Sequence, residues 1–250
     1  MSIASTTVAV AEVEHVPHPM QSEHRPGLFP EKNFRWRAGE ITRLEAFCDV
    51  VFGFALTLLI ISLDVPHSYG ALIEDLRGFF PFALCFSQLV MIWRIHYVYS
   101  RRYGLEDAYT VFLNIVLLFL VLFFVYPLKF VFTLAYSVWI GGNAGPDMSF
   151  RQATILIQLY SAGFASVFLV FMLMFAHAYK LRLPLQLNAV EAHKTRLSIQ
   201  QHAMMVGLGL ASVVLAFKNP VWAGLLYVLL GPLTVIHGII AKRRSRLSQS

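Results

Sequence analysis

The chain has 250 residues, of which 57% are hydrophobic and only 14% are charged, and its formal net charge is +6. Soluble domains carry about 25% charged residues, so this composition excludes an ordinary soluble domain. Apolar runs of the roughly 20 residues that cross a bilayer recur along most of the chain. The sequence therefore predicts an all-α, polytopic membrane protein.

Six transmembrane helices are predicted between two polar tails. Residues 1–38 are predicted to be a disordered cytoplasmic tail, because they hold polar residues and prolines without helical periodicity. A transmembrane domain over 39–241 follows, and residues 242–250 form a basic cytoplasmic tail. Pro127 is expected to kink or end the third span. The predicted spans are 42–63, 77–99, 108–135, 152–176, 199–217 and 221–241.

The basic residues orient these spans. Four groups of basic residues lie before span one, after span two, after span four and after span six. With six spans, all four groups fall on the same side of the membrane, which the positive-inside rule makes the cytoplasmic side. We therefore expect both termini in the cytoplasm. The positive charge reflects topology and contact with anionic lipid headgroups, not nucleic-acid binding. The four groups are Arg25, Lys32, Arg35 and Arg37; Arg101 and Arg102; Lys180, Arg182, Lys194 and Arg196; and Lys242, Arg243, Arg244 and Arg246.

The first span is unusual because its first two turns are charged. Arg43, Glu45 and Asp49 precede an apolar run that continues to Leu63. A charge inside a span costs about 3 kcal/mol or more and usually faces protein or water. These charges therefore require partners on neighbouring helices.

The apolar half of the first span carries a second pattern. Phe54, Leu58 and Ile61 follow the spacing i, i+4, i+7 and share one helical face. Thr57 lies beside them, whereas Asp49 lies about 140° round the helix from Phe54. A stripe of this kind is common in helix packing, and it also suits the lining of a pore.

Polar residues in the second and third spans lie at the same membrane depth as the charges of the first. Trp93 and His96 end the second span, Asp107 precedes the third, and Asn114 lies within it. Pairing can offset the cost of burying a carboxylate. We predict one polar network that joins spans one, two and three, and we expect it to support the helices rather than to contact ions.

The sequence offers no reactive centre. Cys48 and Cys85 lie in predicted spans without metal-ligand spacing, so no metal site is expected. His177 and His237 are both near cytoplasmic ends, which argues against a transmembrane haem pair. No serine has a His and an acid at a depth suited to an intramembrane protease. We expect neither an enzyme nor a bound cofactor.

The motif pattern resembles the transmembrane protein 175 family, the potassium channels of lysosomes and their bacterial relatives. The likeness covers about 40–135 well and 199–240 weakly. Cys48 stands where the family signature R-x-x-x-F-S-D has Ser, and Phe54 stands where relatives have Ile or Leu. The matching residues are Arg43, Phe47, Asp49, Ala55, Thr57, Leu58, Leu59, Val65, Pro66, Trp93, His96, Tyr99, Asp107, Asn114, Tyr126, Pro127, Asn219 and Pro220.

The resemblance implies a passive potassium-permeable channel whose first helix lines the pore. By position, Phe54, Leu58 and Ile61 would form a hydrophobic constriction, Thr57 a ring of hydroxyls, and Asp64 a charge at the outer mouth that attracts monovalent cations. A single six-span repeat implies a homotetramer in the bacterial inner membrane. The residues implied to hold the first helix in place are Arg43, Phe47, Asp49, Trp93, His96, Asp107 and Asn114.

Two other functions remain open at this stage. A proton-coupled secondary transporter would use Arg43, Asp49 and His96 as an ionisable cluster, since such side chains can relay protons. Against it, the chain shows no internal repeat and no pair of spans broken by Gly or Pro, which many carriers have. A structural membrane subunit without transport is the other alternative.

Overall fold

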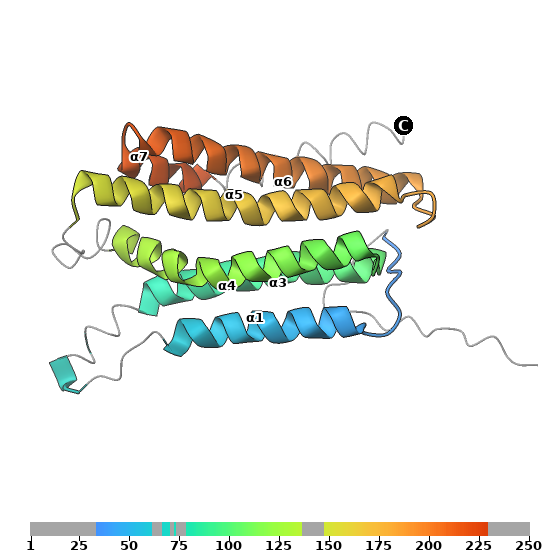
Figure 1. The fold of residues 1–250 in the computed structure, drawn as a ribbon, viewed down its shortest axis with the longest axis horizontal. Helices are drawn as coiled ribbons and strands as arrows, with labels where there is room; N and C mark the ends of the chain where they lie inside the picture. The colour runs from blue at the N-terminus through green and yellow to red at the C-terminus, as the bar shows by residue number, and fades with distance from the viewer. Residues whose placement is uncertain (1–33, 62–66, 71–72, 74–78, 137–147, 230–250) are drawn as a thin grey trace, which may run out of the picture. The chain divides into compact units, whose positions relative to one another are not determined.

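The computed structural model describes residues 34–61, 67–70, 73, 79–136 and 148–229, without the side chains of Ile61, Val228 and Leu229. Within these residues all regular structure is helical, which confirms the predicted fold class (Figure 1). The helices are α1 (Arg43–Ile61), α3 (Phe79–Tyr103), α4 (Ala108–Tyr136), α5 (Phe150–Lys180), α6 (Ala189–Ala216) and α7 (Pro220–Leu225), with a 3-10 helix, η2 (Leu226–Leu229).

The helices match the six predicted spans. Four of them, α3 to α6, are long and apolar enough to cross a membrane. The 19 residues of α1 are also a membrane-sized helix, but its first two turns are charged. The sixth span begins at Pro220 and is described as far as Leu229, and its remainder lies outside the described residues.

Two helices extend further than hydropathy predicts. α6 begins at Ala189, ten residues before the predicted span 199–217, because Asn188 and Glu191 form a capping box that satisfies the polar first turn. Glu191 N donates to Asn188 Oδ1 at 2.9 Å, and Asn188 N donates to Glu191 Oε2 at 3.1 Å. α4 continues past Pro127 to Tyr136, so the proline does not end this helix.

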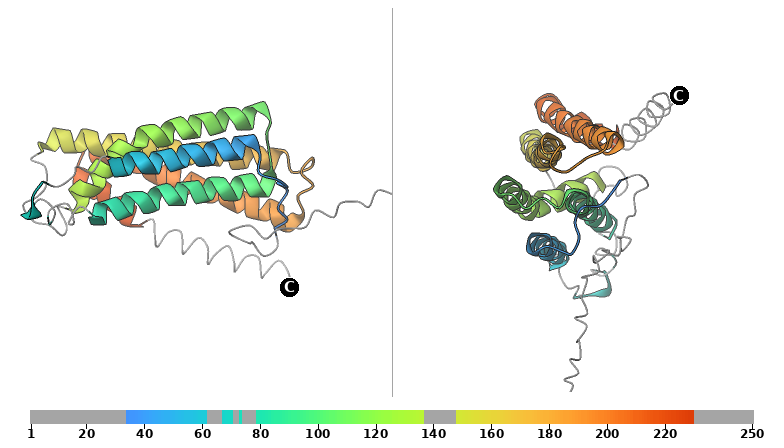
Figure 2. Two further views of the ribbon diagram at one scale, coloured as in Figure 1. Left: turned by 90° about the horizontal axis from the view of Figure 1, so that it is seen from below. Right: turned by 90° about the vertical axis from the view of Figure 1, so that its right-hand side faces the viewer.

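Each helix packs against the helix that follows it in the chain, and α1 also packs against α4. α1 lies against α3 and α4, α4 lies against α5, and α5 runs alongside α6 over most of its length. α7 folds back onto α5 and α6 (Figures 1 and 2). Apolar residues of α4 and α5 form much of the buried core, with Leu117, Val121, Phe171 and Met174 at 0% exposure. α1 is therefore a peripheral helix with one covered side.

One end of the bundle holds the start of α1, the end of α3 and the α5–α6 loop. Residues 34–38, which the sequence places in the disordered tail, pack at this end, and Phe34 is only 6% exposed. Residues 1–33 and 230–250, which include the rest of both predicted tails, lie outside the described residues.

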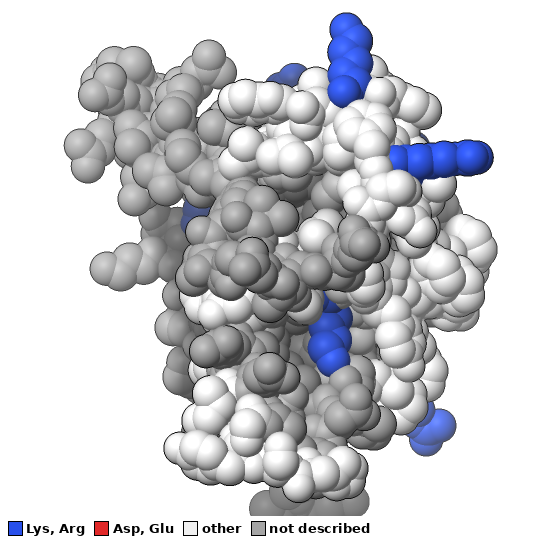
Figure 3. Space-filling view, turned by 90° about the vertical axis from the view of Figure 1, so that its left-hand side faces the viewer, with Lys and Arg blue, Asp and Glu red and all other residues white. Residues whose placement is uncertain are grey.

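The opposite end is seen in Figure 3, where Lys and Arg side chains stand out from an uncharged surface among the described residues. Lys129 near the end of α4, Arg151 at the start of α5 and Lys218 after α6 belong to this end. Four acidic residues that the sequence places between spans one and two and between spans three and four lie outside the described residues. They are Asp64, Glu74, Asp75 and Asp147.

α5 and α6 approach closely through small residues. A Cβ atom added at Gly209 would lie 2.9 Å from Ala165 Cβ and 3.2 Å from the Ser161 carbonyl oxygen. Beside this contact, the hydroxyls of Ser161 and Ser212 lie 2.8 Å apart, and Ser212 donates to the Ala223 carbonyl at 3.0 Å. The glycine thus permits the helix approach that the serine bonds require.

We expect Gly209→Ala to be less stable than Gly207→Ala. Both substitutions raise helix propensity equally, but a Cβ at Gly207 meets nothing within 4 Å. Overpacking at Gly209 should lower the free energy of unfolding by about 1–3 kcal/mol relative to the control. Thermal unfolding in detergent measures this difference, and equal melting temperatures would contradict the described packing.

Candidate functional site

One face of α1 is buried against α3 and α4. The buried positions recur every three or four residues, which is the period of a helix face packed on its neighbours. None of their side chains is more than 4% exposed. They are Glu45, Cys48, Phe52, Ala55 and Leu59.

The other face of α1 is left uncovered by the described part of the chain. Phe54 is 54% exposed and Thr57 is also exposed, whereas Leu58 is half-buried at the edge of this face. The side chain of Ile61 and the whole of Asp64 lie outside the described residues. Three further apolar residues share the uncovered face: Phe47, Val50 and Ile60.

The Thr57 hydroxyl is oriented by its own helix. Its Oγ1 donates to the Phe54 carbonyl oxygen at 2.7 Å. A hydroxyl has one hydrogen to donate and two lone pairs. Since the hydrogen is engaged by the backbone, the lone pairs are free to interact with a positively charged species on the exposed face.

Asp49 finds its partner on the second span. Trp93 Nε1 in α3 donates to Asp49 Oδ1 at 2.8 Å. The carboxylate therefore receives a hydrogen bond that offsets part of its desolvation. Because the indole sits on α3, this bond fixes the rotation of α1 about its axis.

His96 and Asn114 form a second contact between helices. Their atoms Nε2 and Oδ1 are 2.7 Å apart, and Asn114 Nδ2 donates to the Thr110 carbonyl at 2.8 Å. The amide orientation makes Oδ1 the acceptor, so His96 carries its proton on Nε2. Both residues are nearly fully buried, at 1% and 2% exposure. Cys48 Sγ on α1 reaches the same Asn114 oxygen at 3.8 Å.

Asp107 joins α4 to α5 and does not contact α1. Thr110 Oγ1 donates to one carboxylate oxygen at 2.7 Å, and His177 Nε2 lies 2.9 Å from the other. Burial alone would raise the pKa of Asp107, but the hydrogen bonds from Thr110 and His177 outweigh it and hold the pKa below its usual value.

Polar contacts do join spans one, two and three, but Asp107 does not take part in them. Asp49 pairs with Trp93, His96 pairs with Asn114, and Asp107 belongs to another interface. Arg43 and Phe47 lie on the exposed side of α1, away from these pairs. Within the residues that the structure describes, no hydrogen bond or ion pair joins Arg43, Asp49 and His96 to one another.

An ion pair that the sequence analysis missed secures the start of α1. Glu45 Oε2 lies 3.7 Å from Arg101 Nη1 at the end of α3, and their side chains are 4% and 13% exposed. The signal in the sequence was the presence of Glu45 on the same helical face as Cys48 and Phe52.

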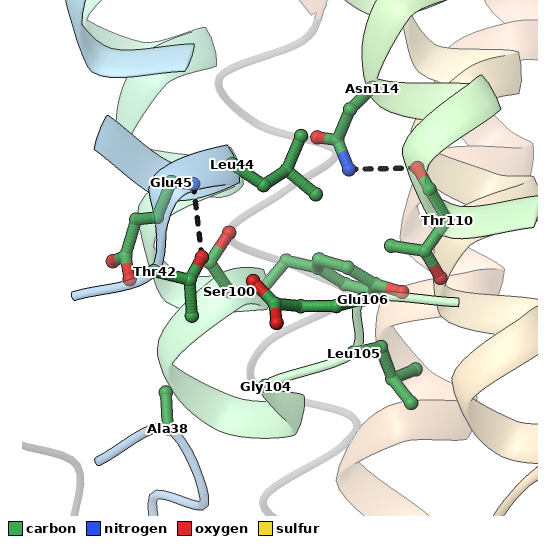
Figure 4. Close-up of a pocket in the computed structure, with 11 residues that line it drawn as sticks. Ala38, Thr42, Leu44, Glu45, Ser100, Gly104, Leu105, Glu106, Thr110 and Asn114 are labelled. Carbon is green, nitrogen blue, oxygen red and sulfur yellow. Dashed lines mark hydrogen bonds between the residues drawn. The ribbon is translucent and has the colours of Figure 1, made fainter. Parts of the chain in front are cut away.

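A small cavity of about 10 Å³ lies beside this ion pair, enough for about one water molecule. Figure 4 shows Thr42 and Glu45 of the α1 segment on one side and Thr110 and Asn114 of α4 on the other. Across the residues that the structure describes, no three His, Cys, Asp or Glu side chains gather as a metal site would need.

Comparison with known proteins identifies the family. A profile described as the endosomal/lysosomal potassium channel TMEM175 matches residues 43–125. A potassium channel from Marivirga tractuosa is 35% identical over 236 residues, which cover 88% of this chain and 94% of the relative. This chain belongs to the TMEM175 family. A potassium channel from Chamaesiphon minutus is 26% identical over 200 residues, 76% of this chain and 91% of that relative.

Two solved structures share the fold of this TMEM175 family member. A crystal structure of the potassium channel MtTMEM175, a threonine-to-alanine variant bound to a nanobody fusion protein, has a TM-score of 0.74 at 33% identity and covers 85% of this chain and 98% of that one. A TMEM175 homologue from Chamaesiphon minutus has a TM-score of 0.56 at 23% identity and covers 80% and 96%. The second match supports the fold alone.

Membership of the TMEM175 family confirms the resemblance read from the sequence motifs. The chain is a multi-pass membrane protein of a potassium channel family, not of an enzyme family. Potassium is the transported ion of this family, and the comparisons indicate no cofactor. The residues of the constriction and the number of subunits stay predictions.

We expect Asn114→Ala to destabilise the protein. The substitution leaves the buried His96 Nε2 without its acceptor, and a buried polar group left unpaired costs about 1–3 kcal/mol. The control is Thr133→Ala, which removes an exposed hydroxyl bonded only within α4. Thermal unfolding of both variants measures the effect, and an unchanged melting temperature for Asn114→Ala would contradict this role.

Proposed function

We propose that this protein conducts potassium passively through a pore lined by α1 in a homotetramer. The observation that carries the proposal is that the two faces of α1 differ in burial. One face is fully packed on α3 and α4, and the other exposes Phe54 and Thr57 without cover from the described chain. Four copies around a symmetry axis would bring four such faces together.

The side chains of the exposed face suit an ion pathway. Phe54 and Leu58, with Ile61 by its position in the sequence, would form apolar rings that gate by dewetting. Thr57 supplies a hydroxyl oxygen whose hydrogen is already bonded to the Phe54 carbonyl at 2.7 Å. Such oxygens can replace part of the hydration of potassium. Asp64 would raise the local concentration of cations at the outer mouth.

The buried polar pairs would hold the pore helix rather than contact ions. Asp49 of α1 accepts a hydrogen bond from Trp93 of α3, and His96 of α3 pairs with Asn114 of α4. Arg43 and Phe47, which lie on the exposed side of α1, would contact neighbouring subunits or lipid. The four-subunit assembly would sit in the bacterial inner membrane with both termini in the cytoplasm, as the basic residues predict.

A proton-coupled transporter is the less favoured function. It requires ionisable residues close enough to relay a proton. Asp49 instead bonds Trp93 at 2.8 Å, and His96 bonds Asn114 at 2.7 Å. These separate pairs favour a structural role for the polar residues.

Purified protein in liposomes should carry potassium down its gradient without a coupled ion. The test loads vesicles with potassium and measures proton uptake with and without a protonophore. Passive potassium efflux draws protons into the vesicle only when the protonophore is present. Empty vesicles are the control. Saturable uptake that requires a proton gradient would favour the transporter, and absence of flux from folded protein would refute both.

Leu58→Ala should raise the potassium conductance. A smaller side chain widens the apolar ring and makes it easier to wet. Leu210→Ala is a suitable control, because Leu210 is 55% exposed on α6 and lies away from α1. Planar-bilayer recordings measure the unitary current of each variant. Equal currents for Leu58→Ala and the unmodified channel would remove Leu58 from the pore.

A further inference from the structure

A short segment before α1 is tightly held by distant parts of the chain. We call residues 34–40 the strap. Its Phe34 is 6% exposed and packs edge-on against Tyr103 at 5.9 Å between ring centroids, with the Arg102 guanidinium 4.8 Å from its ring. Trp36 lies under the Arg101 guanidinium at 5.8 Å. Cation–π contacts of this kind fix the strap on the end of α3.

Arg37 binds the strap to the α5–α6 loop. Its Nε donates to the Leu185 carbonyl at 2.7 Å, and its Nη2 donates to the Gln186 carbonyl at 3.2 Å and to Glu191 Oε2 at 2.6 Å. The planar guanidinium satisfies these three acceptors at once, which a lysine ammonium cannot do in the same geometry.

Glu191 accepts hydrogen bonds from the strap through both of its carboxylate oxygens. Its side chain is 1% exposed, and the Arg37 side chain is 10% exposed, so the ion pair is almost fully removed from water. The other oxygen, Oε1, accepts from the backbone N of Arg35 at 2.7 Å. Because the same carboxylate also caps α6 through Asn188 N at 3.1 Å, the strap is tied directly to the first turn of α6.

The strap continues the connection to α1. Backbone N atoms of Arg37 and Ala38 donate to the Arg101 carbonyl at 3.2 and 3.3 Å. The Arg101 side chain in turn donates to the Gly39 carbonyl at 3.2 Å and faces Glu45 of α1 at 3.7 Å. A chain of polar contacts therefore runs from α6 through the strap to the first turn of α1.

This chain of contacts reaches a helix that α5 and α6 do not touch. Among the described helices α1 packs only against α3 and α4. Residues 41 and 42 separate the strap from α1, and two residues span about 7 Å at most. Because this connection is short, a displacement of the α5–α6 loop also moves the start of α1.

We propose that Arg37 and Glu191 are positioning residues for the pore helix, whose buried ion pair sets the fraction of time that the channel is open. The inference rests on the proposed function, in which α1 lines the pore. The pair lies outside the uncovered face of α1 and does not meet the ions. It therefore acts on the equilibrium between open and closed states, not on the rate or selectivity with which an open pore conducts.

Single-channel recording of Arg37→Gln and Glu191→Gln tests the proposal in the full chain. We expect the ratio of open to closed time to change about fivefold or more, as couplings between distant sites commonly do. The unitary current and the reversal potential should stay unchanged. Arg37→Lys keeps the charge but loses the three-acceptor geometry, so it should recover only part of the original ratio.

Arg35→Gln is the matched control. It removes the same charge two residues away, but the Arg35 side chain is exposed, and its contact with Glu191 is made by the backbone. This variant should behave as the unmodified channel. If Arg37→Gln does not fold, the isosteric Glu191→Gln decides the question alone.

Two outcomes overturn the inference. An unchanged open-to-closed ratio in folded Glu191→Gln shows that the ion pair does not position α1. A change in unitary current or reversal potential places the pair in the conduction pathway instead. Absence of potassium current from the unmodified protein would refute the proposed function, which separates that failure from these two.

Discussion

The need to pair polar groups on α1 governs this fold. A carboxylate in an apolar environment is costly unless it is hydrogen-bonded, and α1 carries two within its first seven residues. Glu45 faces Arg101 and Asp49 accepts from Trp93, both from α3. Both partners lie on α3, so they favour a rotation of α1 about its axis that turns Glu45 and Asp49 toward that helix.

That rotation decides which residues of α1 remain uncovered. With Phe52, Ala55 and Leu59 packed inward, Phe54 and Thr57 necessarily face outward. The costly charges and the apolar stripe are therefore two parts of one arrangement. The charges orient the helix, and the stripe is what the orientation presents to the pore that we propose.

Individual residues show how far sequence reasoning reaches. Asp49 and Trp93 were predicted to share a network because both fall near the same end of their spans, and they are hydrogen-bonded at 2.8 Å. Asp107 was placed in that network by its depth, yet it pairs with His177 of α5. The depth of a residue in the membrane follows from its position along a span, but the identity of the helix that it contacts does not. Residues 34–38 of the strap fall in the segment whose polar composition predicts disorder, since their anchor, Glu191, is more than 150 residues away and leaves no local signal.

The sequence by itself determined the membrane class, the helical fold, the six spans and the family. These follow from local hydropathy and from short motifs, most of them in the first three spans. The tertiary structure decided the partner of each buried charge, the uncovered face of α1 and the tie between Arg37 and α6. Such features depend on which helices pack together and at what rotation, and contacts between distant residues leave no periodic signal in a single sequence.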